Sequence, residues 1–160
     1  MRSRLALFPL CALLASSPAW ADGGTSCAAA QEIFSGLNYS GDTSTSTSFI
    51  GAFGGLPSPG PDLAFKFTYG PGMTDGPIHV TITGGWNAGA VVTAACAGNA
   101  GNPLTAGTGT GAFDVPLTAL TFGTQYYFYV TGNPSDNSGP SGAFSFLVPT
   151  PVALQSFSVD

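Results

Sequence analysis

His79 is the only histidine in the chain, and histidine is the side chain that most readily exchanges a proton near neutral pH. A serine hydrolase would need His79 beside a nucleophilic serine and an orienting acid. The histidine lies instead on the polar side of an alternating segment, and no G-x-S-x-G nucleophile motif occurs. The pattern predicts an exposed strand residue, and we expect no catalytic residues and no enzyme activity.

Carboxylates offer two further chemistries. A pair of them can hydrolyse glycosides, but Glu32 and the seven aspartates form no aromatic-flanked pair in the sequence. Calcium needs several oxygen ligands, and Asp62, Asp75, Asp114 and Asp136 lie at or near expected turns, where each could supply one. The alternative is that these aspartates cap their own backbone. We expect no cofactor, with calcium as the candidate metal.

Aromatic residues suggest a contact surface for a ligand. Trp86 follows two glycines and is expected at a hairpin tip, where its flat face can stack on a sugar ring. Tyr127 and Tyr129 would extend this surface if their side of the strand is exposed. The alternative is a Trp86 side chain folded over the end of the domain.

Residues 1–21 are typical of a secretory signal peptide. Arg2 and Arg4 precede a short apolar run, and an Ala19-Trp20-Ala21 triplet gives a small-x-small cleavage site. The run is shorter than the roughly 20 apolar residues of a membrane span. We expect a bacterial protein that is secreted, periplasmic or held at the cell surface, with no transmembrane segment after cleavage.

Composition narrows the possible partners. Residues 22–148 fit one domain, and beyond the cleavage site eight acids face the single base Lys66, for a net charge of −7. No basic patch exists to neutralise phosphates, which argues against nucleic acid as a partner. Charged residues make up only 7% of the chain, so its surface must consist mainly of threonine, serine, asparagine and glycine.

Two cysteines remain after cleavage, because Cys11 belongs to the signal segment. Cys27 and Cys96 are an even pair in an oxidising compartment, so a disulfide is expected between them. Two buried thiols are the alternative, and a metal site built with the lone histidine would be incomplete.

The elements that must position these residues are mostly strands. Period-two alternation, interrupted by glycine and proline clusters, is typical of strands buried on one face of a sandwich or barrel. The expected strands are residues 63–69, 78–83, 90–95, 111–115, 126–131 and 143–148. Residues 126–131 are apolar on both faces and should be central.

The remaining segments are assigned by composition. Residues 27–34 are rich in alanine and predict one short helix. Residues 36–47 predict a solvated edge strand or loop, whereas residues 51–61 and 107–111 predict a connecting loop and a turn. Residues 149–160 predict a tail that the domain does not need for folding.

Several segments together resemble bacterial pre-peptidase C-terminal (PPC-like) domains. They are residues 61–67 (PDLAFKF), residues 117–130 ending in TFGTQYYFYV, residues 141–146 (SGAFSF), the opening Cys27, Ala30 and Ile33, and Cys96. The resemblance implies a single antiparallel jelly-roll-like β-sandwich of about eight strands, here with one short N-terminal helix. It also implies a non-catalytic module that accompanies secreted proteases.

The sequence therefore favours a secreted binding or structural module that recognises an extracellular polymer, either protein or glycan. Trp86, Tyr127 and Tyr129 are the candidate ligand contacts. One alternative is a subunit of an extracellular assembly that forms through edge-strand pairing, at the edge near residues 36–47 and at the C-terminal strand. A secreted hydrolase of unrecognised type is the other alternative.

Overall fold

The structure is a computed structural model, and it describes residues 23–48, 52–53, 56–57, 60–73, 76–96, 99–100, 103–136 and 138–150. Its main body consists of two β-sheets, one of five strands and one of four, and a small three-stranded sheet lies outside them. Almost no helix is present in the described part of the chain. The prediction of an all-β sandwich is confirmed.

The five-stranded sheet is antiparallel except where its first strand runs parallel to the second. Its strands in spatial order are β1 (Gln31–Glu32), β5 (Leu63–Thr68), β11 (Gln125–Gly132), β7 (Ala88–Thr93) and β9 (Thr105–Gly109). The middle strand, β11, contains residues 126–131, so the expectation that this segment is central is confirmed.

The four-stranded sheet is antiparallel throughout. Its strands in spatial order are β10 (Ala112–Val115), β6 (Ile78–Ile82), β12 (Ala143–Leu147) and β2 (Asn38–Asp42). The small sheet consists of β4 (Leu56–Pro57), β3 (Ala52–Phe53) and β8 (Asn99–Ala100). Part of the segment 51–61, which was expected to be a loop, is therefore paired as strands.

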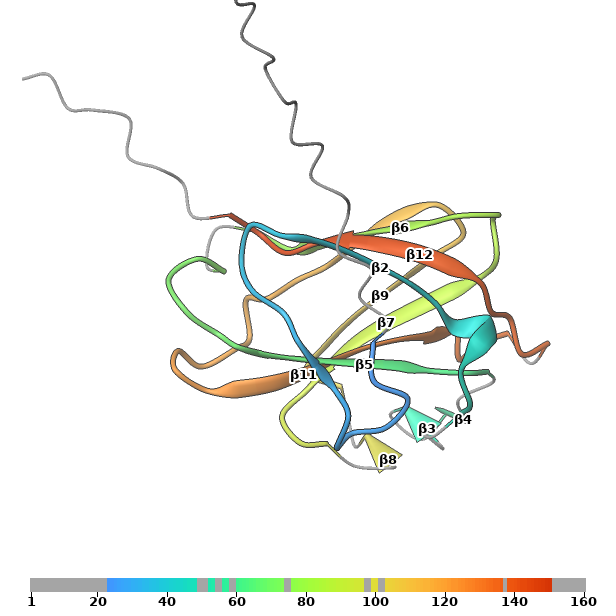
Figure 1. Ribbon diagram of the computed structural model, residues 1–160, viewed down its shortest axis with the longest axis horizontal. Helices are drawn as coiled ribbons and strands as arrows, with labels where there is room; N and C mark the ends of the chain where they lie inside the picture. The colour runs from blue at the N-terminus through green and yellow to red at the C-terminus, as the bar shows by residue number, and fades with distance from the viewer. Residues whose placement is uncertain are drawn as a thin grey trace, which may run out of the picture.

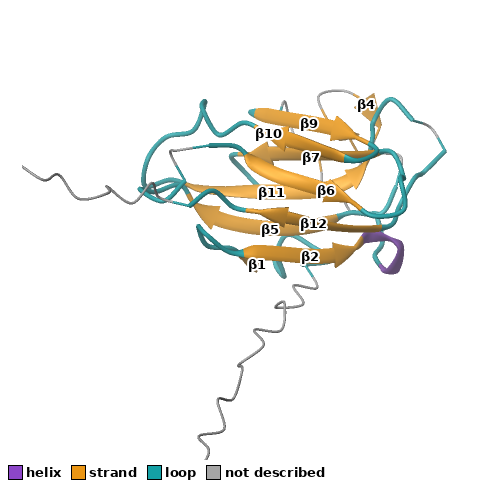
Figure 2. Cartoon of the chain, turned by 90° about the horizontal axis from the view of Figure 1, so that it is seen from above, coloured by secondary structure: helices purple, strands orange, loops and turns teal. Residues whose placement is uncertain are grey.

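The two large sheets form separate layers. In Figure 1, β6, β12 and β2 form the upper layer and β5 and β11 the lower one, with β3, β4 and β8 below them. Figure 2 looks through both layers, with β9 and β10 at one side and β1 and β2 at the other. The small sheet thus lies on the side of the five-stranded sheet that faces away from the four-stranded one.

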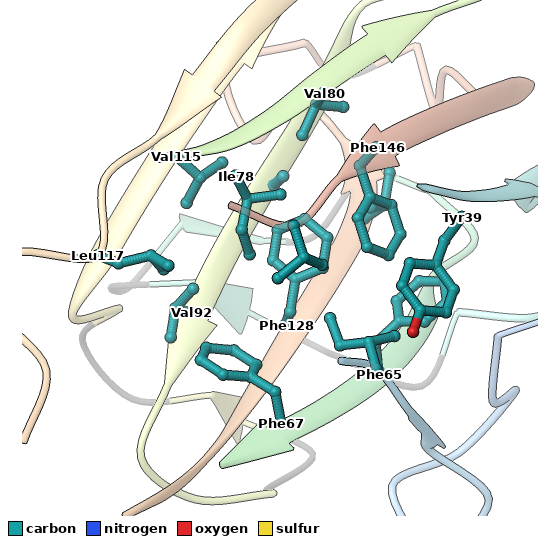
Figure 3. Close-up of a cluster of buried hydrophobic side chains, with 14 of the residues drawn as sticks. Tyr39, Phe65, Phe67, Ile78, Val80, Val92, Val115, Leu117, Phe128 and Phe146 are labelled. Atoms are coloured by element: carbon teal, nitrogen blue, oxygen red, sulfur yellow. The ribbon is translucent and has the colours of Figure 1, made fainter. Parts of the chain in front are cut away.

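The core lies between the two layers and is rich in aromatic rings. Phe146 on β12 is 1% exposed, and its ring centroid lies 4.9 Å from that of Phe65 and 4.9 Å from that of Phe128. Tyr39 on β2 stacks on Phe146 at 5.2 Å, and its hydroxyl accepts a hydrogen bond from the backbone N–H of Phe34. Figure 3 shows these side chains together. These side chains all reach the core because successive residues of a strand point to opposite faces of the sheet, so every second residue points inward.

At one side of the sandwich, β9 and β10 pack closely against each other because β9 has glycines there. A Cβ atom on Gly107 would come 2.4 Å from the carbonyl oxygen of Asp114, and one on Gly109 would come 2.9 Å from the ring of Phe113. Only glycine allows the backbone of β9 to approach β10 this closely. Our prediction of a turn at residues 107–111 is therefore wrong for residues 107–109, which belong to strand β9.

The predicted helix at residues 27–34 is also wrong. Residues 28–29 form a turn, and β1 follows at once and pairs with β5. The backbone N–H of Ile33 donates to the carbonyl of Lys66, which extends this contact with the free edge of β5. A helix of about two turns has little stability of its own, so pairing with the sheet outweighs the propensity of the alanines. The only helix among the described residues is the 3-10 turn Thr43–Thr45.

The expectations for the two ends of the chain can be compared with the structure only in part. The proposed signal peptide, residues 1–21, lies outside the described residues, as do residues 151–160 of the predicted tail. The described part of the tail is not separate from the domain, because Pro149 is buried and its carbonyl accepts a hydrogen bond from Gly36. No helix in the described ranges is long and apolar enough to span a membrane.

Candidate functional site

The two outer faces of the sandwich differ in what covers them. On the five-stranded sheet, Ala64, Tyr129 and Thr131 point away from the core and are nevertheless 0% exposed. On the four-stranded sheet, every outward-pointing strand residue from β2, β6, β10 and β12 is at least partly exposed. The exposed outward-pointing residues of the five-stranded sheet lie on β9 and at the ends of β5 and β11, so the four-stranded sheet has the more open of the two faces.

The outward-pointing side chains of the four-stranded sheet form rows across its strands, because pairing places them opposite one another. One row consists of Asp114, His79, Leu147 and Asn38, and the next of Ala112, Thr81, Ser145 and Ser40. We call these residues, together with Ala143 and Asp42, the outer polar face. A shallow hollow of about 410 Å³ lies over it and is lined by His79, Thr81 and Ser145 among others.

His79 and Asp114 form a pair on this face. They lie directly opposite each other on β6 and β10, with His79 Nδ1 2.5 Å from Asp114 Oδ1. Both side chains are 57% exposed, so the pair lies at the surface as the sequence predicted for His79. The carboxylate orients the imidazole and leaves Nε2 directed away from it. Among the described residues, no serine or threonine hydroxyl bonds to His79.

Sequence reasoning placed His79 correctly but missed its partner. The two residues are 35 positions apart, and only the register of β6 on β10 brings them together. The sequence did contain a signal for this pair, since His79 and Asp114 both occupy polar positions of alternating segments. Polar positions of two such strands can lie opposite each other when the strands pair.

Trp86 lies at the end of the sandwich rather than on the outer polar face. Its Nε1 donates a hydrogen bond to the carbonyl oxygen of Ala143 at 3.0 Å, and its ring packs against the core cluster and against Gly142. The preceding Gly84 and Gly85 have φ of 84° and 70°, which suits the tight turn that we expected before Trp86. The indole is half-buried, with its polar atom satisfied inside the protein.

The two candidate tyrosines lie on the opposite side of the molecule. Tyr129 is 0% exposed, so the exposed surface that we considered for it is not present. Its hydroxyl lies 3.5 Å from Cys27 Sγ and donates to Cys96 Sγ at 3.4 Å. Burial raises the pKa of Tyr129 above its usual value. Tyr127 is half-buried and stacks on Tyr129, so neither residue joins Trp86 in one contact surface.

The two cysteines are joined as predicted. Cys27 and Cys96 form a disulfide with their Cα atoms 5.5 Å apart. The bond connects the segment before β1 with the segment after β7 across the covered face of the five-stranded sheet. Together with Tyr129 it holds that cover in place.

The candidate calcium ligands are dispersed in the structure. Asp62 is 0% exposed and lies near Ser48, and Asp114 pairs with His79. Asp136 accepts hydrogen bonds from Ser138 and from Asn87 Nδ2, and these bonds, chiefly those from Ser138, lower its pKa. Asp75 lies outside the described residues. Within the described ranges, no three histidine, cysteine or acidic side chains gather as metal ligands would.

We compared the chain with known proteins in three ways. A scan against protein-family models, a search of curated proteins and a search of solved structures each find no match to the chain.

Proposed function

We propose that this chain is a secreted, non-catalytic binding module and that the outer polar face is its binding surface. The observation that carries the proposal is the contrast between the two sheets, one covered over its middle strands by chain and disulfide and the other bare across four strands. An uncovered sheet face with rows of hydrogen-bonding side chains suits an extended ligand.

The side chains of this face indicate the class of ligand. Hydroxyl groups of Ser40, Thr81 and Ser145 both donate and accept hydrogen bonds, as does the amide of Asn38. The face carries Asp42 and Asp114, and beyond residue 4 the chain has no lysine or arginine except Lys66, which is on the other sheet. A neutral polymer rich in hydroxyl or amide groups, such as a glycan or an extended protein, therefore fits better than a polyanion.

We also propose the jelly-roll topology for the sandwich. Numbered one to eight along the chain, the eight strands of four or more residues give the sheet orders 6-3-8-1 and 2-7-4-5. Strand one pairs antiparallel with eight, two with seven, three with six and four with five. A long hairpin rolled up once has this pairing, and jelly rolls are built in this way. The resemblance to PPC-like domains points in the same direction.

A polymer retention assay with face-blocking variants tests the function. The purified protein is mixed with insoluble cellulose, chitin, peptidoglycan or collagen, and the bound fraction is measured. Thr81→Arg and Ser145→Arg place a long side chain in the middle of the face, whereas Thr108→Arg places the same group on an exposed position of β9. We expect retention on at least one polymer, loss of retention with the first two variants, and no change with Thr108→Arg.

Two results would count against this function: no retention on any polymer, or equal retention by Thr81→Arg and the unmodified protein. Soluble sugars or peptides released from the polymer would identify a hydrolase instead. Their release should then be abolished by His79→Ala.

A further inference from the structure

The outer edge of β2 presents backbone groups that no other strand among the described residues pairs with. Thr43 N donates to Gly142 O and Val148 N donates to Leu37 O, so the odd-numbered residues of this segment direct their backbone groups toward β12. Along an antiparallel strand, alternate residues direct these groups to opposite sides. The N–H and C=O groups of Asn38, Ser40 and Asp42 therefore point away from the sheet.

Nothing in the described ranges pairs with this edge. β2 is the last strand of its sheet, and the one isolated bridge outside the named strands joins Gly24 to Ala64 on β5. The Asp42 carbonyl accepts from the hydroxyl of Thr45, which leaves it a second lone pair. A pocket of about 570 Å³ adjoins this strand, and its lining includes Thr25, Ser40 and Asp42.

The sequence of β2, NYSGD, has Asp42 as its single charged residue and otherwise lacks the side chains that protect exposed edges. Natural proteins blunt such edges with lysine, proline or a bulge, and β2 has none of these. The opposite side of the sandwich is different, because β9 and β10 pack against each other there. The edge of β2 is thus the place where the four-stranded sheet can be extended.

We propose that β2 pairs antiparallel with β2 of a second copy of this chain, about a two-fold axis that passes between the two Ser40 residues. In this register Ser40 faces Ser40, and Asn38 of each copy faces Asp42 of the other. Each of these three opposing pairs directs its backbone groups inward and can exchange two N–H···O bonds. The two outer polar faces become one continuous surface.

The side chains make this register self-complementary, as a two-fold interface requires. Asn38 is exposed, and its side-chain amide makes no hydrogen bond to any of the described residues. Asp42 Oδ1 accepts from Ser44 N and Ser44 Oγ, which leaves Oδ2 for the Asn38 amide of the other copy. A two-fold axis at Asp42 would instead oppose two carboxylates, so it is disfavoured.

β2 is short, so the proposed dimer should be weak. Stable complexes usually bury roughly 1,200–2,000 Å² of surface, more than two five-residue strands provide. We therefore expect a reversible dimer whose fraction rises with protein concentration.

Sedimentation velocity over a range of concentrations, with three variants, tests the pairing. Ser40→Pro removes a donor that the monomer does not use, so it should abolish the dimer while leaving the thermal midpoint of the monomer nearly unchanged. Asn38→Asp places two carboxylates opposite each other twice per dimer and should weaken association by roughly tenfold. Adding Asp42→Asn to Asn38→Asp restores an amide–carboxylate pair and should restore association, because asparagine also caps the 3-10 turn.

Three outcomes would overturn the proposal. One is a protein that stays monomeric at every concentration. Another is a dimer that Ser40→Pro and Asn38→Asp leave unchanged, since its interface would lie elsewhere. A third is a dimer that disappears when residues 151–160 are deleted, because that segment would then be the strand that occupies the edge. Binding to polymers by the monomeric Ser40→Pro variant would separate this proposal from the proposed function.

Discussion

Trp86 lies directly against the backbone of Gly142. A Cβ atom on Gly142 would come 2.6 Å from Cδ1 and 2.8 Å from Nε1 of Trp86. The same indole donates its hydrogen bond to the carbonyl of the next residue, Ala143. Trp86 thus holds the β6–β7 connection against the start of β12. This contact is possible only because residue 142 has no side chain.

Gly142→Ala should therefore destabilise the protein by about 1–3 kcal/mol, since overpacking displaces the indole and strains its hydrogen bond. Urea unfolding measures the change. Gly111→Ala is the matched control, because a Cβ there would meet nothing within 4 Å. In a Trp86→Ala background the cost of Gly142→Ala should largely vanish, and an undiminished cost would show that the two residues are not coupled.

Strand alternation is what made much of this fold predictable. Ile78, Val80 and Ile82 are buried while His79 and Thr81 are exposed, as the period of two in β6 indicates. β11 was recognised as central for the opposite reason, because its residues are apolar on both faces and both faces are buried. Where burial follows from residue type, sequence reasoning predicts the strand.

The missed elements are those whose residue types do not reveal burial. β9 (Thr105–Gly109) is composed of threonine, alanine and glycine, and its place depends on how closely Gly107 can approach β10. The pairing of His79 with Asp114 depends on register between distant strands. The outer polar face is missed for the same reason, because its rows exist only once four strands are aligned.

The Cys27–Cys96 disulfide should make a large contribution to stability. The two residues are 69 positions apart, and in the chain-entropy model a closed loop of this size stabilises the folded state by about 4 kcal/mol. Urea unfolding of Cys27→Ser/Cys96→Ser should show this loss. Tyr129→Phe keeps the disulfide and removes the hydroxyl that contacts the sulfur atoms, so it should cost about 1 kcal/mol. Equal midpoints for the unmodified protein and the double serine variant would contradict the prediction.

Asp136 should stabilise the protein in a pH-dependent way. Hydrogen bonds from Ser138, with a further one from Asn87, hold the pKa of Asp136 below its usual value of 3.8 in the folded state. A group whose pKa is lowered by folding stabilises the protein above its unfolded-state pKa, and this contribution is lost as the pH falls through the folded-state pKa.

Asp136→Ala should accordingly lower the thermal midpoint at neutral pH, and the difference from the unmodified protein should shrink as the pH is brought below 3.8. Calorimetry across this pH range measures it. Ser138→Ala, which removes one of the donors, should give a smaller effect of the same sign. A difference that stays constant with pH would mean that the carboxylate charge contributes nothing.

The end of the domain lies beyond the boundary that the sequence suggested. The prolines predicted a tail from residue 149, but Pro149 is buried and its carbonyl accepts a hydrogen bond from Gly36 N at 3.1 Å. Val148 O accepts from the same N–H, and Val148 N donates to Leu37 O, so this contact continues the β12–β2 pairing. Pro149 therefore belongs to the folded domain.

Deleting residues 149–160 should consequently cost more stability than deleting residues 151–160. Gly36 N keeps Val148 O as an acceptor, so the difference should be about 1 kcal/mol for the loss of the second acceptor and of the buried Pro149 ring, which corresponds to a few degrees in the thermal midpoint. Differential scanning calorimetry on the two truncated proteins measures it directly. Equal thermal midpoints for the two truncated proteins would show that the domain ends at residue 148. If neither truncated protein folds, residues 151–160 contribute to the core, and the domain extends further along the chain than Thr150.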